Sequence, residues 1–266
     1  MRYRRLRNLA ILTICGFLFG VRPSRLQAEQ PGPQAVAAFE SYSRAVESRL
    51  TKQHRSADMF LAPTSAEVVR NGEPVIERVT ESGAARPEGA LIHHWRGTAF
   101  APGAKAATFE HLLRDFNSYP KHFAPQVVQA RVLSERGDHM RASMRVRQKH
   151  VITVVMDISY DIEFGKLDSQ RGYTTSKSIQ ISEIDSPGTA AERALRADEA
   201  HGFLWRLNTW WSYEERDGGL YVQIESISLT RGIPRGLGWA IRPYVESVPR
   251  ESLEFTLRSA VNAIRK

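Results

Sequence analysis

Two adjacent histidines, His93 and His94, come nearest in this chain to an acid–base or metal-binding pair. They lie in an apolar run that predicts a β-strand over residues 91–100. Neighbouring residues on a strand point to opposite faces of the sheet, so the two imidazoles cannot readily enter one ligand sphere. We therefore expect one imidazole to face inward and the other to face solvent. We predict no metal site and no cofactor.

Three carboxylates, Asp157, Asp161 and Glu163, share one face of another predicted strand. Paired carboxylates can divide the roles of general acid and general base. The preceding strand, residues 141–149, carries alternating basic residues. We interpret the two patterns together as a solvated face of opposite charges, not as a catalytic pair.

Other signatures of catalysis are missing from the sequence. Gly232, Gly236 and Gly238 follow a strand but lack the spacing of a phosphate-binding loop, and there is no Gly-x-Ser-x-Gly elbow. The single cysteine, Cys15, lies in the N-terminal segment. The rest of the chain therefore has no thiol nucleophile, thiolate metal site or disulfide.

Residues 1–28 have the outline of a secretory signal peptide. Arginines without acids occupy residues 2–7, residues 9–21 are apolar, and a small-residue cleavage site precedes Glu29. The apolar run is shorter than the roughly 20 residues that span a bilayer. We expect a periplasmic or secreted protein, with an uncleaved N-terminal membrane anchor as the alternative.

The positive charge of the chain belongs mostly to that segment. Residues 1–28 hold six arginines and no acid, so their removal lowers the net charge from +8 to +2. No long basic block remains to follow a phosphate backbone. We therefore predict no nucleic-acid partner.

The remaining chain reads as a meander of antiparallel strands followed by a helix. We expect a signal peptide over residues 1–28, an N-terminal extension over 29–90 and one main domain over 91–266. The clearest strand, residues 151–164, alternates strictly between apolar and polar residues, so one of its faces is buried. The expected strands cover residues 91–100, 127–133, 141–149, 151–164, 173–184, 201–214 and 220–230. We also expect a helix over 34–50, a hairpin at Asn71-Gly72, a loop with a helical turn over 185–200, and a C-terminal helix opened by Pro249.

The segment Thr108–Val128 carries the most specific pattern. Phe109, Leu112, Leu113 and Phe116 form one helical stripe, which Thr108 can cap and which Pro120 ends. The pattern Phe-x2-Leu-Leu-x-Asp-x3-Tyr-Pro-x2-Phe-x-Pro resembles the first helical segment of START-like (SRPBCC) domains, closest to the coenzyme Q-binding and polyketide cyclase-like branch. The resemblance covers roughly residues 91–266. It implies an α+β helix-grip fold, in which a curved antiparallel sheet wraps around a long C-terminal helix and encloses a cavity for a hydrophobic ligand.

The last predicted hairpin can be registered from its turn. If Arg216 pairs with Gly219, the inward face is bulky near the turn and changes to small hydroxyl residues further along. Small residues on a buried face leave space unless a large neighbour fills it. The alternative is that Leu257, Trp239 or the extension plugs this space. The predicted ligand-binding residues are Tyr160, Trp205, Leu207, Thr209, Trp211, Ile224, Ser226, Ser228 and Leu257.

Three functions fit these patterns. The leading one is an exported START-like protein that binds a lipid, isoprenoid or polyketide-like molecule as a carrier, with transient membrane contact left open. The second is an enzyme of cyclase or hydrolase type, in which Tyr160, Thr209, His93 or His94 would supply acid–base groups. The third is an interaction module with a filled cavity. No catalytic residue is assigned, and the oligomeric state stays open.

Overall fold

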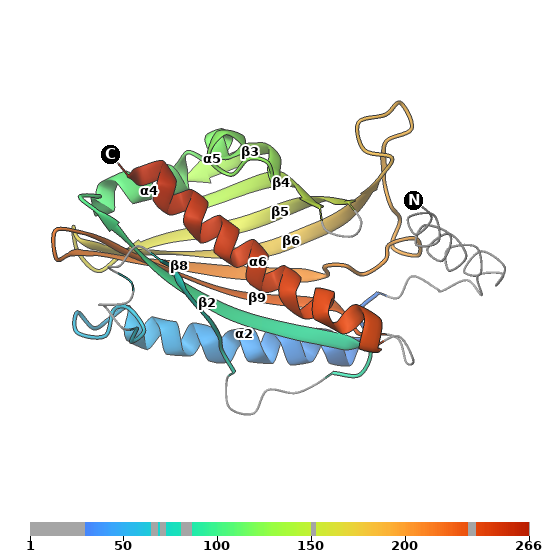
Figure 1. Cartoon of the computed structure of the whole chain (residues 1–266), viewed down its shortest axis with the longest axis horizontal. Helices are drawn as coiled ribbons and strands as arrows, with labels where there is room; N and C mark the ends of the chain where they lie inside the picture. Colours follow the sequence, from blue (N-terminus) through green and yellow to red (C-terminus); the bar gives the residue numbers. More distant parts are fainter. Residues whose placement is uncertain are drawn as a thin grey trace, which may run out of the picture.

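The computed structural model describes residues 30–64, 69, 73–80, 87–149, 153–233 and 238–265. A curved antiparallel sheet carries the C-terminal helix on one face and the N-terminal helix α2 on the other (Figure 1). The strands are β1 (Val75–Arg78), β2 (Ala90–Pro102), β3 (Val127–Arg136), β4 (His139–Lys149), β5 (Thr153–Lys166), β6 (Arg171–Asp185), β7 (Arg193–Ala194), β8 (Arg206–Arg216) and β9 (Gly219–Arg231). The helices are α2 (Pro33–Gln53), α4 (Ala106–Arg114), the 3-10 turn η1 (Phe116–Ser118), α5 (Tyr119–His122) and α6 (Gly238–Ile264).

The strands follow the order β1-β2-β9-β8-β6-β5-β4-β3, and the short β7 pairs with β6. Helix α6 crosses the inner face of this sheet (Figure 1). It packs tightly on β2 at Gly97, where an added Cβ would lie 2.8 Å from Leu253 Cδ2 and 2.9 Å from Leu257 Cδ2. The absence of a side chain at Gly97 lets the helix approach the strand. The α+β helix-grip architecture predicted from the sequence is confirmed.

The register of the last hairpin is also confirmed. Arg216 pairs with Gly219, and the pairing continues through Thr209 with Ser226 to Leu207 with Ser228. The same register, extended along the strand, would pair Trp205 with Thr230, but this pair does not form, because β8 begins at Arg206 and not at the expected residue 201.

Helix α4 begins earlier than predicted and is capped differently. It starts at Ala106, so Thr108 lies inside it and is not its cap. The carboxylate of Glu215 accepts a hydrogen bond from the Ala106 backbone N–H at 3.0 Å and pairs with Lys105 at 2.6 Å. An acid near a helix N-terminus satisfies its free N–H groups. Pro120 does not end the helical segment, because it occupies the first turn of α5, where a proline is tolerated.

The start of the C-terminal helix was predicted too late. Helix α6 is 27 residues long and begins at Gly238, so Pro249 lies within it. Val245 and Val248 lie on the turn before this proline and contribute to the inner face. The helix continues through Pro249, although a proline removes one backbone hydrogen bond.

The hairpin expected at Asn71-Gly72 is wrong in its described part. Val69 is helical, and β1 pairs with β2, while Asn71 and Gly72 themselves lie outside the described residues. Residues 185–200, expected as a loop, include the two-residue strand β7.

Helix α2 covers the outer face of β8, β9 and β2 (Figure 1). Phe39 and Val46 of α2 join a buried cluster with Trp210, Ile227 and Leu229 of the sheet. This cluster is separate from the one beneath α6. Both faces of this part of the sheet are therefore buried.

A buried ionic cluster ties α2 to the sheet. Glu225 of β9, which is 2% exposed, pairs with Arg49 of α2 and with His94 Nε2 at 2.8 Å. His94 Nδ1 lies 2.9 Å from the Tyr42 hydroxyl of α2. Burial alone would raise the pKa of the Glu225 carboxyl, but His94 and Arg49 hold it below its ordinary value. The sequence predicted one solvated histidine, but both are buried. His94 faces outward and lies under α2, and His93 is buried as well.

His54, just after α2, makes a second polar contact with the sheet. Its Nε2 lies 2.7 Å from the Ser212 hydroxyl, and its ring stacks on Tyr173 at 4.1 Å between centroids. Burial lowers the pKa of His54 from its ordinary 6.5 to about 4; Arg49 lowers it further and Glu225 opposes the change. His54 is therefore neutral at pH 7.

We predict that His54 makes the protein less stable in mild acid. The unfolded chain binds a proton to His54 more readily than the folded chain, so stability falls as the pH drops from 6.5 to about 4. The His54 contribution over this range is about 3 kcal/mol. Urea unfolding at several pH values should show a shallower pH dependence for His54→Gln.

The control is His111→Gln, at an exposed position of α4. This variant should keep the pH dependence of the parent, part of which also comes from Glu225. Equal slopes for the two variants and the parent would contradict the assignment to His54.

Candidate ligand-binding cavity

A cavity of about 950 Å³ lies between the inner face of the sheet and α6. Its described lining is mainly apolar and comes from α4, η1, α5, β3 to β6, β8, β9, α6 and residues 201–204. Apolar side chains that include Leu113, Phe116, Phe164, Trp211 and Ile224 lie toward α4 and the β8–β9 turn. Protein interiors are normally close-packed, so a space of this size inside a well-formed core is unusual. The alternative that Leu257 plugs it is not met, since Leu257 packs beside Gly97.

A row of small hydroxyl residues crosses the floor of the cavity. Ser176 of β6 pairs with Thr209 of β8, which pairs with Ser226 of β9. All three line the cavity, and none of them hydrogen-bonds through its side chain to a described residue. The row is a consequence of strand register, because paired residues share a face.

Two tyrosines add further hydroxyls. Tyr119 of α5 donates to the Leu113 carbonyl oxygen at 3.2 Å, and Tyr160 of β5 has no hydrogen-bond partner among the described residues. Burial raises the pKa of both phenols, so they remain protonated across the physiological range. Each is a neutral hydrogen-bonding group within an apolar lining.

The loop before β8 forms an edge of the cavity that reaches solvent. His201 and Phe203 line the cavity, and Phe203 is 40% exposed. The buried carboxylate of Glu183 accepts hydrogen bonds from the backbone N–H groups of His201, Gly202 and Phe203 at 2.9 to 3.0 Å. The same carboxylate lies 2.9 Å from His201 Nδ1. One carboxylate thus holds the backbone of this edge in place.

The predicted site residues divide into two groups. Tyr160, Leu207, Thr209, Trp211, Ile224, Ser226 and Ser228 line the cavity. Trp205 packs on the opposite face with the α2 cluster, because it precedes β8, and Leu257 lies in the core beside β2. Ser176, Tyr119 and Glu183 were missed, because their positions depend on pairing between distant segments.

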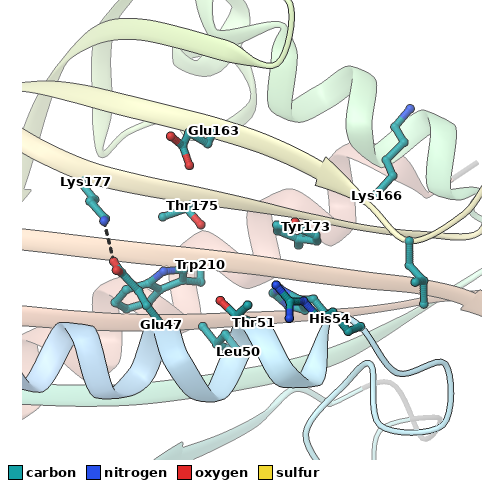
Figure 2. A pocket seen from close by; sticks show the side chains of 12 residues that line it. Glu47, Leu50, Thr51, His54, Glu163, Lys166, Tyr173, Thr175, Lys177 and Trp210 are labelled. Atoms are coloured by element: carbon teal, nitrogen blue, oxygen red, sulfur yellow. Dashed lines mark ion pairs between the residues drawn. The ribbon is translucent and has the colours of Figure 1, made fainter.

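A second, smaller pocket of about 440 Å³ lies on the outer face between α2 and strands β5, β6 and β8. Figure 2 shows that charged and hydroxyl side chains surround it. Lys177 pairs with Glu47 at 2.7 Å (Figure 2), and Lys166 pairs with Glu110 at 2.7 Å. Its polar lining makes it a poor site for an apolar ligand.

The residues considered for catalysis do not assemble into a site. His93 and His94 do not line the cavity, and the carboxylates of β5 lie on the outer face. Asp157 pairs with Arg145 at 2.6 Å, which confirms the expected face of opposite charges. In the described part of the chain, no group of three or more His, Cys, Asp or Glu side chains could hold a metal ion. No described helix is long and apolar enough to cross a membrane.

No family model matches the chain, and no curated protein matches it. Solved structures of similar fold include a STAR-related lipid transfer protein from Xanthomonas axonopodis, with 16% identity over 72% of this chain and 99% of that one and a TM-score of 0.44. A second is the Zhui aromatase/cyclase from Streptomyces, with 14% identity over 65% of this chain and 93% of that one and a TM-score of 0.44. A third is human STARD10, with 9% identity over 89% of this chain and 82% of that one and a TM-score of 0.44. The sheet order and the position of α6 in this chain agree with the helix-grip fold that the START-like resemblance implies. At these identities neither lipid transfer nor cyclisation is assigned to this chain.

We predict that Glu183 controls the order of the loop at the cavity edge. Glu183→Gln keeps the shape of the side chain but replaces one acceptor oxygen with an amide donor. Hydrogen bonds to a charged group contribute roughly 1.5–3 kcal/mol. Hydrogen–deuterium exchange at Gly202 and Phe203 should therefore become at least about tenfold faster.

The matched control is Glu163→Gln, an exposed carboxylate on the outer face of β5. It should leave exchange at residues 201–203 unchanged. Unaltered protection in Glu183→Gln would show that other contacts hold this loop.

Proposed function

We propose that this protein binds an apolar small molecule between the sheet and α6 and carries it without chemical change. The observation that supports this function is the cavity of about 950 Å³ with a mainly apolar lining. Ligand pockets typically measure roughly 300–1,000 Å³ and combine apolar walls with a few polar groups. A lipid, isoprenoid or polyketide-like molecule has matching chemistry.

The described lining favours a carrier over an enzyme. Tyr160 and Thr209 face the cavity, but no described imidazole or carboxylate lies beside them to exchange protons. His201, the one imidazole among the described lining residues, sits at the solvent edge with Glu183. General acid–base catalysis requires a group within hydrogen-bond reach of the reacting atoms.

We further propose that the carrier works outside the cytoplasm. The support is the pattern of residues 1–28, which lie outside the described residues. In that setting the cavity would shield an apolar molecule from water between membranes or between proteins.

Ser228 provides a test of the cavity. It lines the space opposite Leu207, so Ser228→Leu adds apolar bulk there. We expect an unchanged or raised melting temperature, since each buried methylene stabilises by about 0.8 kcal/mol. Uptake of the neutral dye Nile red, measured by its fluorescence, should weaken.

The control for this test is Ser134→Leu at an exposed position of β3, which should leave dye uptake unchanged. In a filled core, Ser228→Leu would instead cost about 1–3 kcal/mol. A clearly destabilised Ser228→Leu, in a parent protein that takes up no dye, would refute the carrier function.

Export has a direct test. Mature protein isolated from its host should begin at or near Glu29 and should fractionate outside the cytoplasm, because the apolar run is too short to remain as a span. N-terminal sequencing gives the answer. An intact Met1 in a membrane fraction would replace the cleaved signal with an anchor.

A further inference from the structure

Charged groups are nearly absent from the described lining of the cavity. Arg231 and His201 are the two exceptions, and both lie at the edge formed by the end of β9 and the loop before β8. Arg231 lies at the end of β9, and its backbone N–H donates to the Gly202 carbonyl oxygen at 2.9 Å, so it belongs to this edge. His201 is already bonded to Glu183. The deeper lining around Thr209 and Trp211 therefore offers an anion no cationic partner among the described residues.

Neutral hydrogen-bonding groups are present where charges are absent. Ser176, Thr209 and Ser226 form a continuous row, and their hydroxyls have no partner among the described residues. A hydroxyl can donate to a carbonyl oxygen or accept from another hydroxyl. An ionised carboxylate at the same depth would lose its hydration without gaining a counter-charge, which is strongly unfavourable.

The row lies part-way along the cavity. Trp211 and Ile224 form the next inward pair toward the β8–β9 turn, and Leu207 and Ser228 form the next pair on the other side. Toward the β8–β9 turn the wall is mainly apolar, with Trp211, Phe164 and Phe116, and Thr174 is the hydroxyl residue among them. A ligand that uses the hydroxyl row must place its polar group part-way along its length, with apolar body toward the turn.

We propose that the ligand is an uncharged, elongated molecule with a carbonyl or hydroxyl oxygen near its middle, and that the cavity discriminates against anionic amphiphiles such as free fatty acids. This inference rests on the proposed function and names the chemical class of its ligand. The hydroxyl row selects the oxygen, and the uncharged interior excludes the anion.

Three probes of equal length test the selection. They are a nineteen-carbon n-alkane, the ketone of that length with its carbonyl at the chain centre, and the fatty acid of that length. Each is delivered from cyclodextrin at pH 8 and competes with Nile red for the full chain. The ketone should displace the dye at about five- to tenfold lower concentration than the alkane, as expected for one or two hydrogen bonds, and also at lower concentration than the acid.

Two variants then assign the selection to the row. Thr209→Val and Ser226→Ala each remove one hydroxyl with little change in shape, so each should shrink the ketone's advantage about threefold and leave alkane binding unchanged. The matched control is Thr175→Val, which lies next to Ser176 but on the outer face of β6. Either variant suffices if the other does not fold, and the wild-type comparison needs neither.

The outcomes separate this inference from the proposed function. If Nile red and the probes bind but the ketone is no better than the alkane, or the acid binds as well as the ketone, the inference is wrong and the carrier function stands. An unchanged preference in both variants would also overturn it, since the hydroxyl row would then be merely hydrated. If the dye and all three probes fail to bind, the proposed function fails, and the inference with it.

Discussion

The close approach of α6 to β2 at Gly97 determines how much space the fold encloses. Leu253 and Leu257 anchor the helix at this strand, so its distance from the sheet is set at one side. The inward residues of β5, β6 and β8 then face the helix across the cavity. The inward serine and threonine residues of β6, β8 and β9 are too small to close the gap. The cavity is therefore a consequence of where the helix is anchored and which residues oppose it.

The outer face of the sheet, at β2 and β9, has a different chemistry. There, Glu225, His94 and Arg49 form a buried ionic cluster between α2 and the sheet. Such groups are tolerated in a core because each has a partner, and the loss of one partner leaves an uncompensated charge. Apolar packing around Trp210 surrounds them. The sheet thus separates the apolar cavity on its inner face from the ion-paired cluster on its outer face.

Sequence patterns predicted the local features of this fold well. The Arg216–Gly219 turn fixed the β8–β9 register correctly, so Thr209, Ser226 and Ser228 were placed on the cavity face in advance. Period-2 alternation and turn position depend on residues close together in the sequence, so they can be read before the long-range contacts are known. Trp205 was misplaced because the register was extended past the first residue of the strand.

Features that depend on distant contacts were not predicted. Ser176 joins the hydroxyl row only through the pairing of β6 with β8, and Glu183 acts on a loop about twenty residues later in the chain. Glu215 replaces the expected Thr108 cap for the same reason.

The burial of both faces of β9 has a further consequence. Because Glu225 and Ser226 are adjacent yet belong to different faces, residues that line the cavity and residues that contact α2 alternate along one strand. A substitution at an inward position would therefore change the cavity and leave the contacts to α2 in place.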